Sequence, residues 1–358
     1  MTLFDSPAFE GHEGVHAFAD EASRLKCVIA VHSTARGPAA GGCRMWPYAS
    51  AEEALTDALR LSRAMSYKNA MADLELGGGK SVIIGDSRTQ KTPALFEAFG
   101  QAVEALGGKY WTAEDVGVSP ADLAHARRRT RYVAGLDDHP AASGDPSPVT
   151  AEGVFRGVRL CVRRALGRDL DGVRVAIQGV GHVGEHLAKK LRAAGAKLVL
   201  TDVNGEALRR VAAETDAETA APSAIFDVDC DVFAPCAMGG AVSLDTIPHL
   251  RARVVAGAAN NQLAGPEAGQ ELFRRGILYA PDYVINGGGI INVAGEIRAL
   301  ERGEAFDPAW VDARLERLMS TLDEVLDQAQ RERRPTHDVA NAIARARIAG
   351  AAAERAAA

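Results

Sequence analysis

The chain has 358 residues, which is long for a single hydrophobic core and predicts two domains of ordinary size. Its formal net charge of −6 argues against a general affinity for nucleic acid or for anionic membrane surfaces. The five cysteines form no C-x-x-C pair and no zinc-like cluster, and the opening MTLFDSPAFEGHEG lacks the basic and apolar regions of a signal peptide. We therefore expect a soluble, cytoplasmic protein with reduced thiols, no bound metal, and neither nucleic acid nor membrane as a partner.

The first third of the chain is predicted to mix strands and helices. KCVIAVHS (residues 26–33) favours a strand. A helix is predicted from Ala51, because Ser50 and Glu53 fit the S-x-x-E capping box and apolar residues then recur at helical spacing. Further elements are predicted as a strand at SVIIGD (81–86), a helix near Pro93, a strand at KYWTA (109–113) and a helix begun by Ser119 and Pro120.

A domain boundary is predicted at DHPAASGDPSP (138–148), where three prolines and a glycine exclude regular structure and favour a hinge. We expect residues 1–145 to form a first domain. Residues 146–335 are expected to form a second domain, and 336–358 a C-terminal helix that packs back on the first.

The second half has a more regular pattern. After a helix at about 150–166, short β-rich runs alternate with helical segments at VRVAIQG, AKLVLTD, DVFAPCA, RVVAGAAN and GILYAPD, and the tail beyond Asp307 is helical. This alternation predicts a parallel, doubly wound sheet. The expected fold class is α/β.

A dinucleotide fingerprint lies in VRVAIQGVGHVGEHLAKKL, where Gly179-x-Gly181-x-x-Gly184 follows a predicted strand and opens a helix. In this motif the first glycine allows a tight turn, the second lets the backbone approach the pyrophosphate, and the third lets helix and strand pack closely. The alternative is a glycine-rich turn with no ligand. The residues predicted to surround the cofactor phosphates are Gly179, Val180, Gly181, His182, Val183 and Gly184.

Asp202 ends the next predicted strand, about 20 residues beyond these glycines. Its carboxylate could accept hydrogen bonds from a ribose hydroxyl and would repel a 2′-phosphate, so NAD is favoured over NADP as cofactor. An arginine nearby could accommodate the phosphate, which leaves NADP open.

LELGGGKSVIIGD (74–86) could either hold a nucleotide phosphate or present a reactive lysine. A phosphate-binding P-loop is excluded, because position 74, where its first glycine should stand, is Leu74, and the strand follows the loop. Lys68 and Lys80 lie twelve residues apart. If they share a cleft, mutual repulsion and desolvation would let one act as a base while the other anchors a carboxylate. The alternative is two separate surface lysines.

At these residues the chain resembles the glutamate/leucine/phenylalanine/valine dehydrogenases, nearest the leucine branch. The resemblance runs from about residue 25 to 300, through GPAAGGCRMWPY, MSYKNAMADLELGGGKS, TAEDVG, GDPSPVTAEGV, QGVGHVG, GAANNQL and YAPDYVINGGGIINVAGE. It implies reversible, NAD-dependent oxidative deamination of an apolar L-amino acid to a 2-oxo acid and ammonia. It also implies a homo-oligomer of open size. With the fingerprint, it implies an N-terminal α/β substrate-binding and oligomerisation domain over 1–145, a doubly wound Rossmann NAD-binding domain over 146–335, and a cleft between them.

The resemblance assigns roles in the first domain. Lys68 would pair with the substrate carboxylate, and Lys80 would be the general base that activates water. Asp115 would shuttle protons to and from the amino group. Gly41 and Gly42 would offer backbone to the substrate, and the glycines of GGGK would leave room beside Lys80.

In the second domain, Thr150 would hold the nicotinamide carboxamide, and Cys236 and Ala237 would line the cofactor cleft. Asn260 or Asn261 would contact the substrate and the nicotinamide ribose. We assign Asn260 to the cofactor and Asn261 to the substrate, although the adjacent pair leaves the choice open.

The resemblance places the side-chain pocket near Ala40, Ala113, Ile290 and Val293, none of which could anchor the distal carboxylate of glutamate. Leucine, valine and isoleucine are therefore favoured, with phenylalanine or another aromatic amino acid as the alternative. Two departures from the family weaken this choice. Ala40 stands where leucine is expected, which would enlarge the pocket, and NGGGIIN carries Gly287 where alanine is expected.

Two functions of other classes compete. A non-catalytic NAD-binding regulator would be expected to have lost Lys68, Lys80 or Asp115, and all three are present. A hydroxy-acid dehydrogenase would need a histidine and a carboxylate as acid and base, and no such pair is evident in the first domain.

Overall fold

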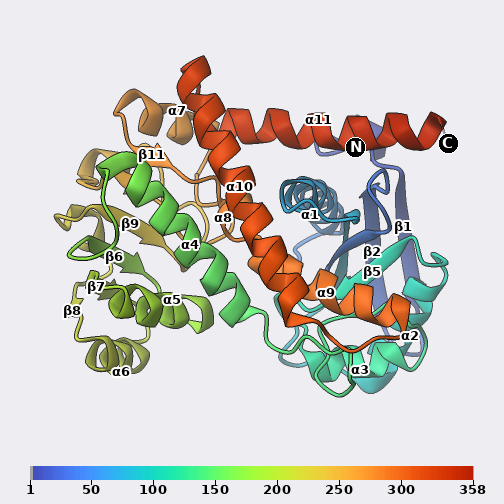
Figure 1. Cartoon of the computed structure of the whole chain (residues 1–358). Coiled ribbons are helices and arrows are strands. Elements are labelled where there is room, and N and C mark those ends of the chain that lie inside the picture. The colour runs from blue at the N-terminus through green and yellow to red at the C-terminus, as the bar shows by residue number, and fades with distance from the viewer. Residues whose placement is uncertain (1–2, 358) are drawn as a thin grey trace. The chain divides into compact units, whose positions relative to one another are not determined.

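A computed structural model describes residues 3–357, and these form two compact units. Unit 1 comprises 3–145, Ile290–Val311 and 344–357, and unit 2 comprises Pro146–Gly289 and Asp312–Ile343 (Figure 1). A continuous second domain over 146–335 is therefore wrong at Ile290–Val311. That segment joins unit 1 because its buried carboxylate, Glu296, binds the backbone of Gly135 and Ser143.

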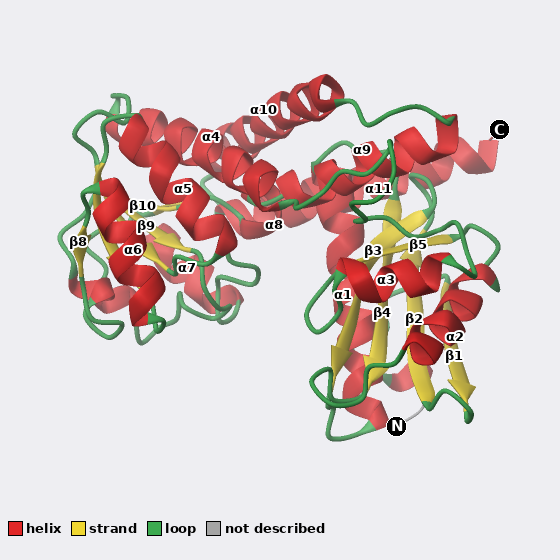
Figure 2. Cartoon of the chain, turned by 90° about the horizontal axis from the view of Figure 1, so that it is seen from below, coloured by secondary structure: helices red, strands yellow, loops and turns green. Residues whose placement is uncertain are grey.

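The sheet of unit 1 has five strands, in the order β1-β2-β4-β3-β5 (Figure 2). β2 runs antiparallel to β1 and β4, whereas β3 runs parallel to β4 and β5. β1 and β3 were not predicted, and β4 begins at the first glycine of GGGK, which was expected to be a loop. The strands are β1 (Gly14–Asp20), β2 (Leu25–Ser33), β3 (Ala39–Trp46), β4 (Gly77–Ile84) and β5 (Tyr110–Ala113).

Helices cover both faces of this sheet. α1 (Ala51–Met71) packs Ala58 and Leu59 against Ala30 and Val82 on one face. α2 (Pro93–Glu104) and α3 (Pro120–Arg127) bury Phe96, Phe99 and Leu123 against the other. As predicted, Ser50 caps α1 by accepting from the Glu53 amide, although the Glu53 carboxylate reaches back to Ala49. These layers fix β4 between α1 and the main core.

Unit 2 contains a parallel sheet in the order β11-β10-β9-β6-β7-β8. The chain starts this sheet at its centre with β6, adds two strands on one side and then three on the other, as in doubly wound nucleotide-binding folds. In such sheets, ligands bind at the carboxyl ends of the strands where the direction of strand addition changes. In this sheet the change occurs beside β6. The strands are β6 (Arg174–Gln178), β7 (Lys197–Thr201), β8 (Glu218–Thr219), β9 (Val232–Pro235), β10 (Val254–Val255) and β11 (Leu278–Tyr279).

The helices differ from the prediction in two regions. α8 and α9 lie between Asp282 and Asp307, where no helix was predicted. α4 begins at Ser147, inside the stretch expected to be irregular, because Pro148 occupies its first turn, where a missing N–H costs nothing. α10 and α11 each have residues in both units. The remaining elements are α4 (Ser147–Leu166), α5 (His182–Ala193), α6 (Gly205–Thr215), α7 (Pro266–Arg274), α8 (Asp282–Ile285), α9 (Gly288–Arg302), α10 (Pro308–Glu332), α11 (Thr336–Ala357) and the 3-10 turns η1 (Leu3–Asp5), η2 (Ile225–Asp227) and η3 (Ile247–His249).

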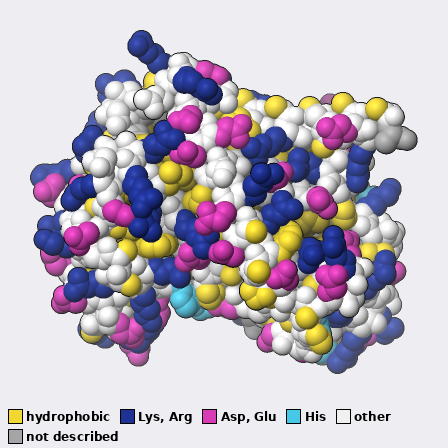
Figure 3. Space-filling model, in the orientation of Figure 1, with side chains coloured by type: hydrophobic (Ala, Val, Ile, Leu, Met, Phe, Trp, Pro, Cys, Tyr) yellow, Lys and Arg dark blue, Asp and Glu magenta, His cyan; other side chains and the backbone are white. Residues whose placement is uncertain are grey.

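Charged side chains of both signs are interspersed on the face drawn in Figure 3. Some form bridges between helices of unit 2. Arg156 on α4 pairs with Asp312 and Glu316 on α10 at 2.6 Å each. Across residues 3–357, the helices are all too short or too polar to span a lipid bilayer.

Candidate active site

Lys80 lies in the middle of β4, and only 6% of its surface is exposed. Its ammonium group donates a hydrogen bond to the carboxylate of Asp115, two residues beyond the end of β5. Asp115 is held there by a tight turn in which the Val118 amide donates to its carbonyl and Gly117 has a φ of +80°. Two predicted catalytic residues, 35 positions apart in sequence, are therefore in direct contact.

The environment of Asp115 keeps its carboxyl group ionised. Burial by itself would raise the pKa of this group, but the charges of Lys80 and Arg44 outweigh burial and lower the pKa to about 2. At neutral pH the site thus holds a carboxylate between two basic side chains.

Arg44 was not predicted as a site residue. It lies on β3, with its Nε 3.4 Å from Asp115 Oδ2 and its Nη1 donating to Asp57 Oδ2 at 3.0 Å. Tyr48 donates its hydroxyl proton to the same Asp57 oxygen at 2.6 Å. Arg44 stands two residues after the glycine pair in GPAAGGCRMWPY, but nothing in its spacing pointed to Asp115 or Asp57.

The glycines near Lys80 do not leave room for a substrate, contrary to the expectation. A Cβ on Gly77 would lie 1.9 Å from the Ser33 carbonyl oxygen, and one on Gly78 would lie 2.1 Å from the Ser66 nitrogen. A Cβ on Gly79 would meet the ring of Tyr110 at 2.7 Å. The protein itself fills these positions, so the GGG run is needed for the close approach of α1 and neighbouring strands to β4.

The same holds for the glycine pair on β3. A Cβ on Gly41 would lie 1.9 Å from the Gly79 carbonyl oxygen, and one on Gly42 would lie 2.4 Å from that of Glu114. The buried Tyr110 hydroxyl donates to the Gly41 carbonyl at 2.6 Å, which fixes this backbone. The pair thus allows β3 to lie close to the segments that carry Lys80 and Asp115.

Lys68 lies in the last turn of α1, next to residues that contact β4. Ser66 packs on Gly78, and Asn69 donates its side-chain amide to the Gly77 carbonyl at 2.5 Å. The two lysines of interest therefore come from two elements that touch, α1 and β4.

The four expected pocket residues all belong to unit 1 and are almost completely buried. Ala40 pairs with Gly78 across β3 and β4, and Ala113 pairs with Gly42 across β5 and β3. Ile290 and Val293 lie on α9.

A buried carboxylate ties α9 to the segment beside Ala113. Glu296 accepts hydrogen bonds from the amides of Gly135 at 3.0 Å and Ser143 at 3.1 Å, and Gly135 lies beside Ala113 and Glu114. This contact fixes the helix of Ile290 and Val293 on unit 1.

The glycine loop of unit 2 shows why each glycine is present. Gly179 has a φ of +101°, which disfavours any other residue. A Cβ on Gly184 would lie 2.1 Å from the Gly179 carbonyl oxygen, so this position needs glycine for packing. A Cβ on Gly181 would meet no described atom within 4 Å. The fold does not require glycine at Gly181, which is what a position approached by a ligand would show.

The first turn of α5 fits a bound anion. Its N-cap is Gly181, and no side chain within residues 3–357 caps the helix, so its first amides are available to phosphate oxygens. Asp202 accepts from the Val180 amide at 2.7 Å and from the Asn204 amide at 2.8 Å, which holds its carboxylate against the loop. His182 and Val183 form the start of the same helix.

Three other expected cofactor residues lie in unit 2. Ala237 packs against Gly179, and the Cβ of Cys236 lies 3.5 Å from the position that a Cβ on Gly184 would take. Thr150 lies in the first turn of α4, and its hydroxyl donates to the Pro146 carbonyl at 2.8 Å.

The adjacent asparagines are held differently. The side-chain amide of Asn286, which sequence reasoning missed, donates to Asn260 Oδ1 at 2.9 Å. Asn261 has a φ of +51° and its carbonyl accepts from the Gly240 amide at 2.7 Å. Gly287 follows Asn286. A Cβ there would lie 3.2 Å from both Leu318 Cδ2 and the Val284 carbonyl oxygen, so an alanine would require a small shift of the side chain and of the backbone.

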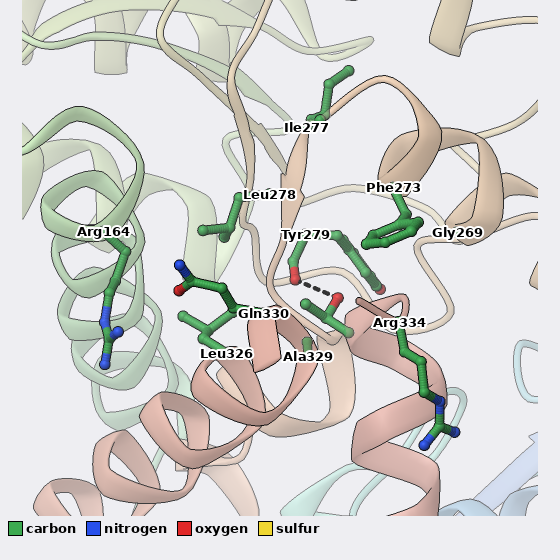
Figure 4. Close-up of a pocket in the computed structure, with 12 residues that line it drawn as sticks. Arg164, Gly269, Phe273, Ile277, Leu278, Tyr279, Leu326, Ala329, Gln330 and Arg334 are labelled. Atoms are coloured by element: carbon green, nitrogen blue, oxygen red, sulfur yellow. Dashed lines mark hydrogen bonds between the residues drawn. The ribbon is translucent and has the colours of Figure 1, made fainter. Parts of the chain in front are cut away.

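A separate pocket of about 310 Å³ lies among α7, β11 and α10 (Figure 4). Phe273, Leu278 and Leu326 form much of its apolar lining, and a hydrogen bond from Thr336 to the Tyr279 carbonyl crosses one side. It contains none of the predicted site residues.

Comparison with known families settles which kind of protein this is. Residues 12–132 match the family model described as Glu/Leu/Phe/Val dehydrogenase, dimerisation domain. Residues 143–209 and 200–356 match the model described as Glutamate/Leucine/Phenylalanine/Valine dehydrogenase. The chain belongs to this dehydrogenase family. As a member of the Glu/Leu/Phe/Val dehydrogenase family it is an amino-acid dehydrogenase, an enzyme of a class that uses nicotinamide cofactors.

Individual members of the Glu/Leu/Phe/Val dehydrogenase family are similar over nearly the whole chain. Leucine dehydrogenase from Geobacillus stearothermophilus is 47% identical over 349 residues, which cover 97% of this chain and 94% of that protein. Valine dehydrogenase from Streptomyces virginiae is 45% identical over 354 residues, which cover 98% and 97%. The crystal structure of L-tryptophan dehydrogenase from Nostoc punctiforme superimposes with a TM-score of 0.82 at 38% identity, covering 95% of this chain and 97% of that one. The predictions of family, fold class and enzyme class are confirmed.

Proposed function

We propose that this amino-acid dehydrogenase oxidises leucine, valine and isoleucine with NAD, reversibly, to the 2-oxo acid, ammonia and NADH. The observation that carries the proposal is the contact between the buried ammonium of Lys80 and the ionised carboxylate of Asp115. Such a pair can hold and transfer protons in a site protected from water, which the chemistry of an amine and an imine requires.

The nicotinamide, when bound, supplies the hydride chemistry by accepting hydride from the substrate Cα. The chain's residues handle the protons. Asp115 takes a proton from the substrate ammonium group, which leaves a neutral amine able to release hydride and become a cationic imine. Lys80, in its neutral form, takes a proton from the water whose oxygen bonds to the imine carbon. The resulting carbinolamine regains a proton on nitrogen from Asp115, and ammonia leaves with the C–N bonding pair. Asp115, ionised again, then takes the hydroxyl proton as the carbonyl group forms.

Substrate binding is assigned to other residues of unit 1. Lys68 is proposed to pair with the substrate carboxylate. Ala40, Ala113, Ile290 and Val293 are proposed to surround the side chain, and they include no cation that could bind the second carboxylate of glutamate. The leucine and valine dehydrogenases at 47% and 45% identity support an aliphatic substrate.

An aromatic substrate is the second candidate. It is favoured by Ala40, where the family pattern leads us to expect leucine, and by the similarity to L-tryptophan dehydrogenase at 38% identity. A difference of one methylene changes discrimination by only about 1–3 kcal/mol, so the enzyme's specificity can extend over several side chains.

NAD is proposed over NADP because Asp202 places a carboxylate against the glycine loop. The proposed cofactor set is Gly179, Val180, Gly181, His182, Val183, Gly184, Asp202, Thr150, Cys236, Ala237 and Asn260. Asn261 is assigned to the substrate. Arg209 is a cation that could favour NADP, since its Nη1 would lie 3.5 Å from a Cβ on Gly205, three residues beyond Asp202.

The deciding experiment measures NADH formation with a panel of L-amino acids, comparing kcat/KM for leucine, valine, isoleucine, phenylalanine, tryptophan and glutamate. Leucine, valine or isoleucine should lead, and NAD should exceed NADP. The reverse reaction should require ammonium, which a hydroxy-acid dehydrogenase would ignore. If an aromatic amino acid leads, the substrate assignment fails while the proton chemistry stands.

We also propose that the enzyme is a homo-oligomer assembled through unit 1. The family model that matches residues 12–132 is described as a dimerisation domain, and β1 is an edge strand of the sheet. Light scattering coupled to size exclusion should give a mass that is a multiple of 37.7 kDa. The five free cysteines agree with a reducing compartment, so we place the reaction in the cytoplasm.

A further inference from the structure

We propose that Arg44 is a positioning residue that sets the proton balance of the Lys80–Asp115 pair, by remaining a counter-ion to Asp115 whether or not Lys80 carries its proton. The inference rests on the proposed function, in which Lys80 must lose its proton in order to act as a base. It assigns a role to a residue outside the expected catalytic set.

The geometry places two cations on one carboxylate oxygen. Both Lys80 Nζ and Arg44 Nε lie against Asp115 Oδ2, the latter at 3.4 Å. Arg44 Nε is buried and forms no hydrogen bond with any atom of residues 3–357, so its interaction with Asp115 is one of charge. Arg44 can therefore keep its place beside the carboxylate whatever the proton on Lys80 does.

Arg44 is anchored from its other side. Its Nη1 donates to Asp57 on α1 at 3.0 Å, and the Tyr48 hydroxyl donates to the same oxygen. Burial lowers the pKa of Arg44, but the carboxylates of Asp115 and Asp57 outweigh burial and raise that pKa above its ordinary value. Arg44 is thus charged at every pH at which the enzyme works.

The electrostatic consequence has a definite sign. A fixed positive charge near Lys80 repels the ammonium form, and it also shares the carboxylate that would otherwise stabilise that form alone. Both effects favour the neutral amine. When Lys80 does lose its proton, Arg44 still compensates the charge of Asp115, so the carboxylate is not left buried and unpaired.

Several other ionisable groups around the pair are neutral or are paired with a carboxylate. Burial raises the pKa of the Cys43 thiol to about 12, and burial also raises the pKa values of Tyr48 and Tyr110, so these three groups are neutral. Lys91 is paired with Asp122 at 2.5 Å. The other charged groups on the surrounding elements are Asp57, Asp122, Lys91, Glu114 and Lys68. The Arg44 variants tested below leave all of them unchanged, so their effect on Lys80 cancels in the comparison with the wild type.

The test is the pH dependence of kcat/KM for whichever L-amino acid the wild-type enzyme oxidises fastest. On the side of the profile where kcat/KM rises with pH, the half-point is the pH at which kcat/KM reaches half of its maximum. In Arg44→Met this half-point should move to higher pH by about half to one unit. The ionisation of the free substrate is the same for every variant and cancels in this comparison. Arg44→Lys keeps a positive charge and should recover at least half of that displacement.

Arg36→Met is the matched control, because Arg36 is also a half-buried arginine of unit 1, paired with Asp73 at 3.0 Å. Its profile should coincide with that of the wild type. Asp57→Asn weakens the anchor of Arg44 but keeps the Arg44 charge. It also removes a negative charge that would favour the ammonium form of Lys80, so the half-point of this variant should stay or move to lower pH. This variant also keeps the proposal testable if Arg44→Met fails to fold.

A lower kcat in Arg44→Met with an unmoved half-point would mean that Arg44 only supports the fold, and would overturn the proposal. An upward movement in Asp57→Asn would do the same. Failure of the proposed function looks different, because then either no amino acid is oxidised by the wild type or Lys80→Ala remains active.

Discussion

Lys80 and Asp115 form one hydrogen-bonded ion pair, but replacing each of them should affect activity and stability differently. Lys80 is buried in the middle of a strand, whereas Asp115 stands in a turn with about a fifth of its side chain exposed. Asp115 also retains Arg44 as a partner if Lys80 is removed. Replacing the lysine should therefore damage the chemistry more than the fold.

Lys80→Ala is expected to lower kcat by about 10²–10⁴-fold, the usual contribution of a general base, while NAD binding measured by titration stays unchanged. Lys91→Ala is the control, since Lys91 is also a lysine of unit 1 paired with an aspartate. It should keep nearly full turnover. Near-normal turnover in Lys80→Ala would show that another group is the base.

The lowered pKa of Asp115 predicts how acid acts on stability. Because the pKa falls from 3.8 to about 2 on folding, ionised Asp115 stabilises the protein above pH 4, and this contribution is lost as pH falls toward 2. Asp115→Asn should lower the free energy of unfolding by about 2 kcal/mol at neutral pH, and the difference should shrink between pH 4 and 2. Urea unfolding over that range measures it. A difference that does not change with pH would assign the loss to packing.

At the scale of elements, the glycine loop and α5 separate two reasons for a glycine. Gly184 is required by the protein, since a Cβ would collide with the Gly179 carbonyl, whereas Gly181 faces open space among the described residues. Gly184→Ala should therefore destabilise unit 2 by about 1–3 kcal/mol or more, because backbone cannot move aside cheaply.

Gly181→Ala should instead keep its thermal midpoint within about 1 °C of wild type while its affinity for NAD falls at least about tenfold. Calorimetric unfolding and NAD titration of the same samples provide both readouts. Unchanged NAD affinity in Gly181→Ala would show that the cofactor does not approach this position.

The elements with a regular signal were predictable from the sequence, and those made by close packing were not. β2, α1 and the strands of unit 2 other than β8 follow apolar periodicity, caps and alternation. β3 was missed because Gly41 and Gly42 disfavour a strand, and their purpose appears only when the Gly79 and Glu114 carbonyls are in place. For the same reason GGGK looked like an open loop, although it is a buried strand.

The candidate site was predictable only in part. Lys68, Lys80, Asp115 and the glycine loop lie in long motifs that resemble the family's. Arg44 and Asp57 are thirteen residues apart, on a strand and a helix, and only the fold places them in contact. Neither periodicity nor spacing encodes such a contact, so a charge network of this kind becomes visible only in three dimensions.

At the scale of the whole molecule, α11 is a single helix whose residues are divided between the two units. Its part in unit 1 is held by Arg347, which donates to the Ala70 carbonyl at 3.1 Å, and Ala344 is buried there. Beyond Gly350 the helix is largely exposed.

Two truncations should therefore behave differently. A chain ending at Gly350 should lose no more than about 1–2 °C of its thermal midpoint, since it loses mainly the Arg355 contact with the Thr34 carbonyl. A chain ending at Ile343 also loses Ala344 and Arg347 and should unfold at least about 4 °C lower. Equal midpoints for the two truncated chains would mean that the Arg347 anchor contributes nothing.

The buried carboxylate of Glu296 has a consequence for how the protein is made. Until α9 has been synthesised, the amides of Gly135, Leu136 and Ser143 lack the acceptor that they have in the finished protein. Folding of the first 145 residues can therefore be completed only after most of unit 2 has been translated, when the segment Ile290–Val311 has been made. During this interval the first unit is incomplete, a condition under which chaperones are expected to assist folding. Expression yield should accordingly depend more on the pace of translation and on chaperone supply than the stability of the finished enzyme would suggest.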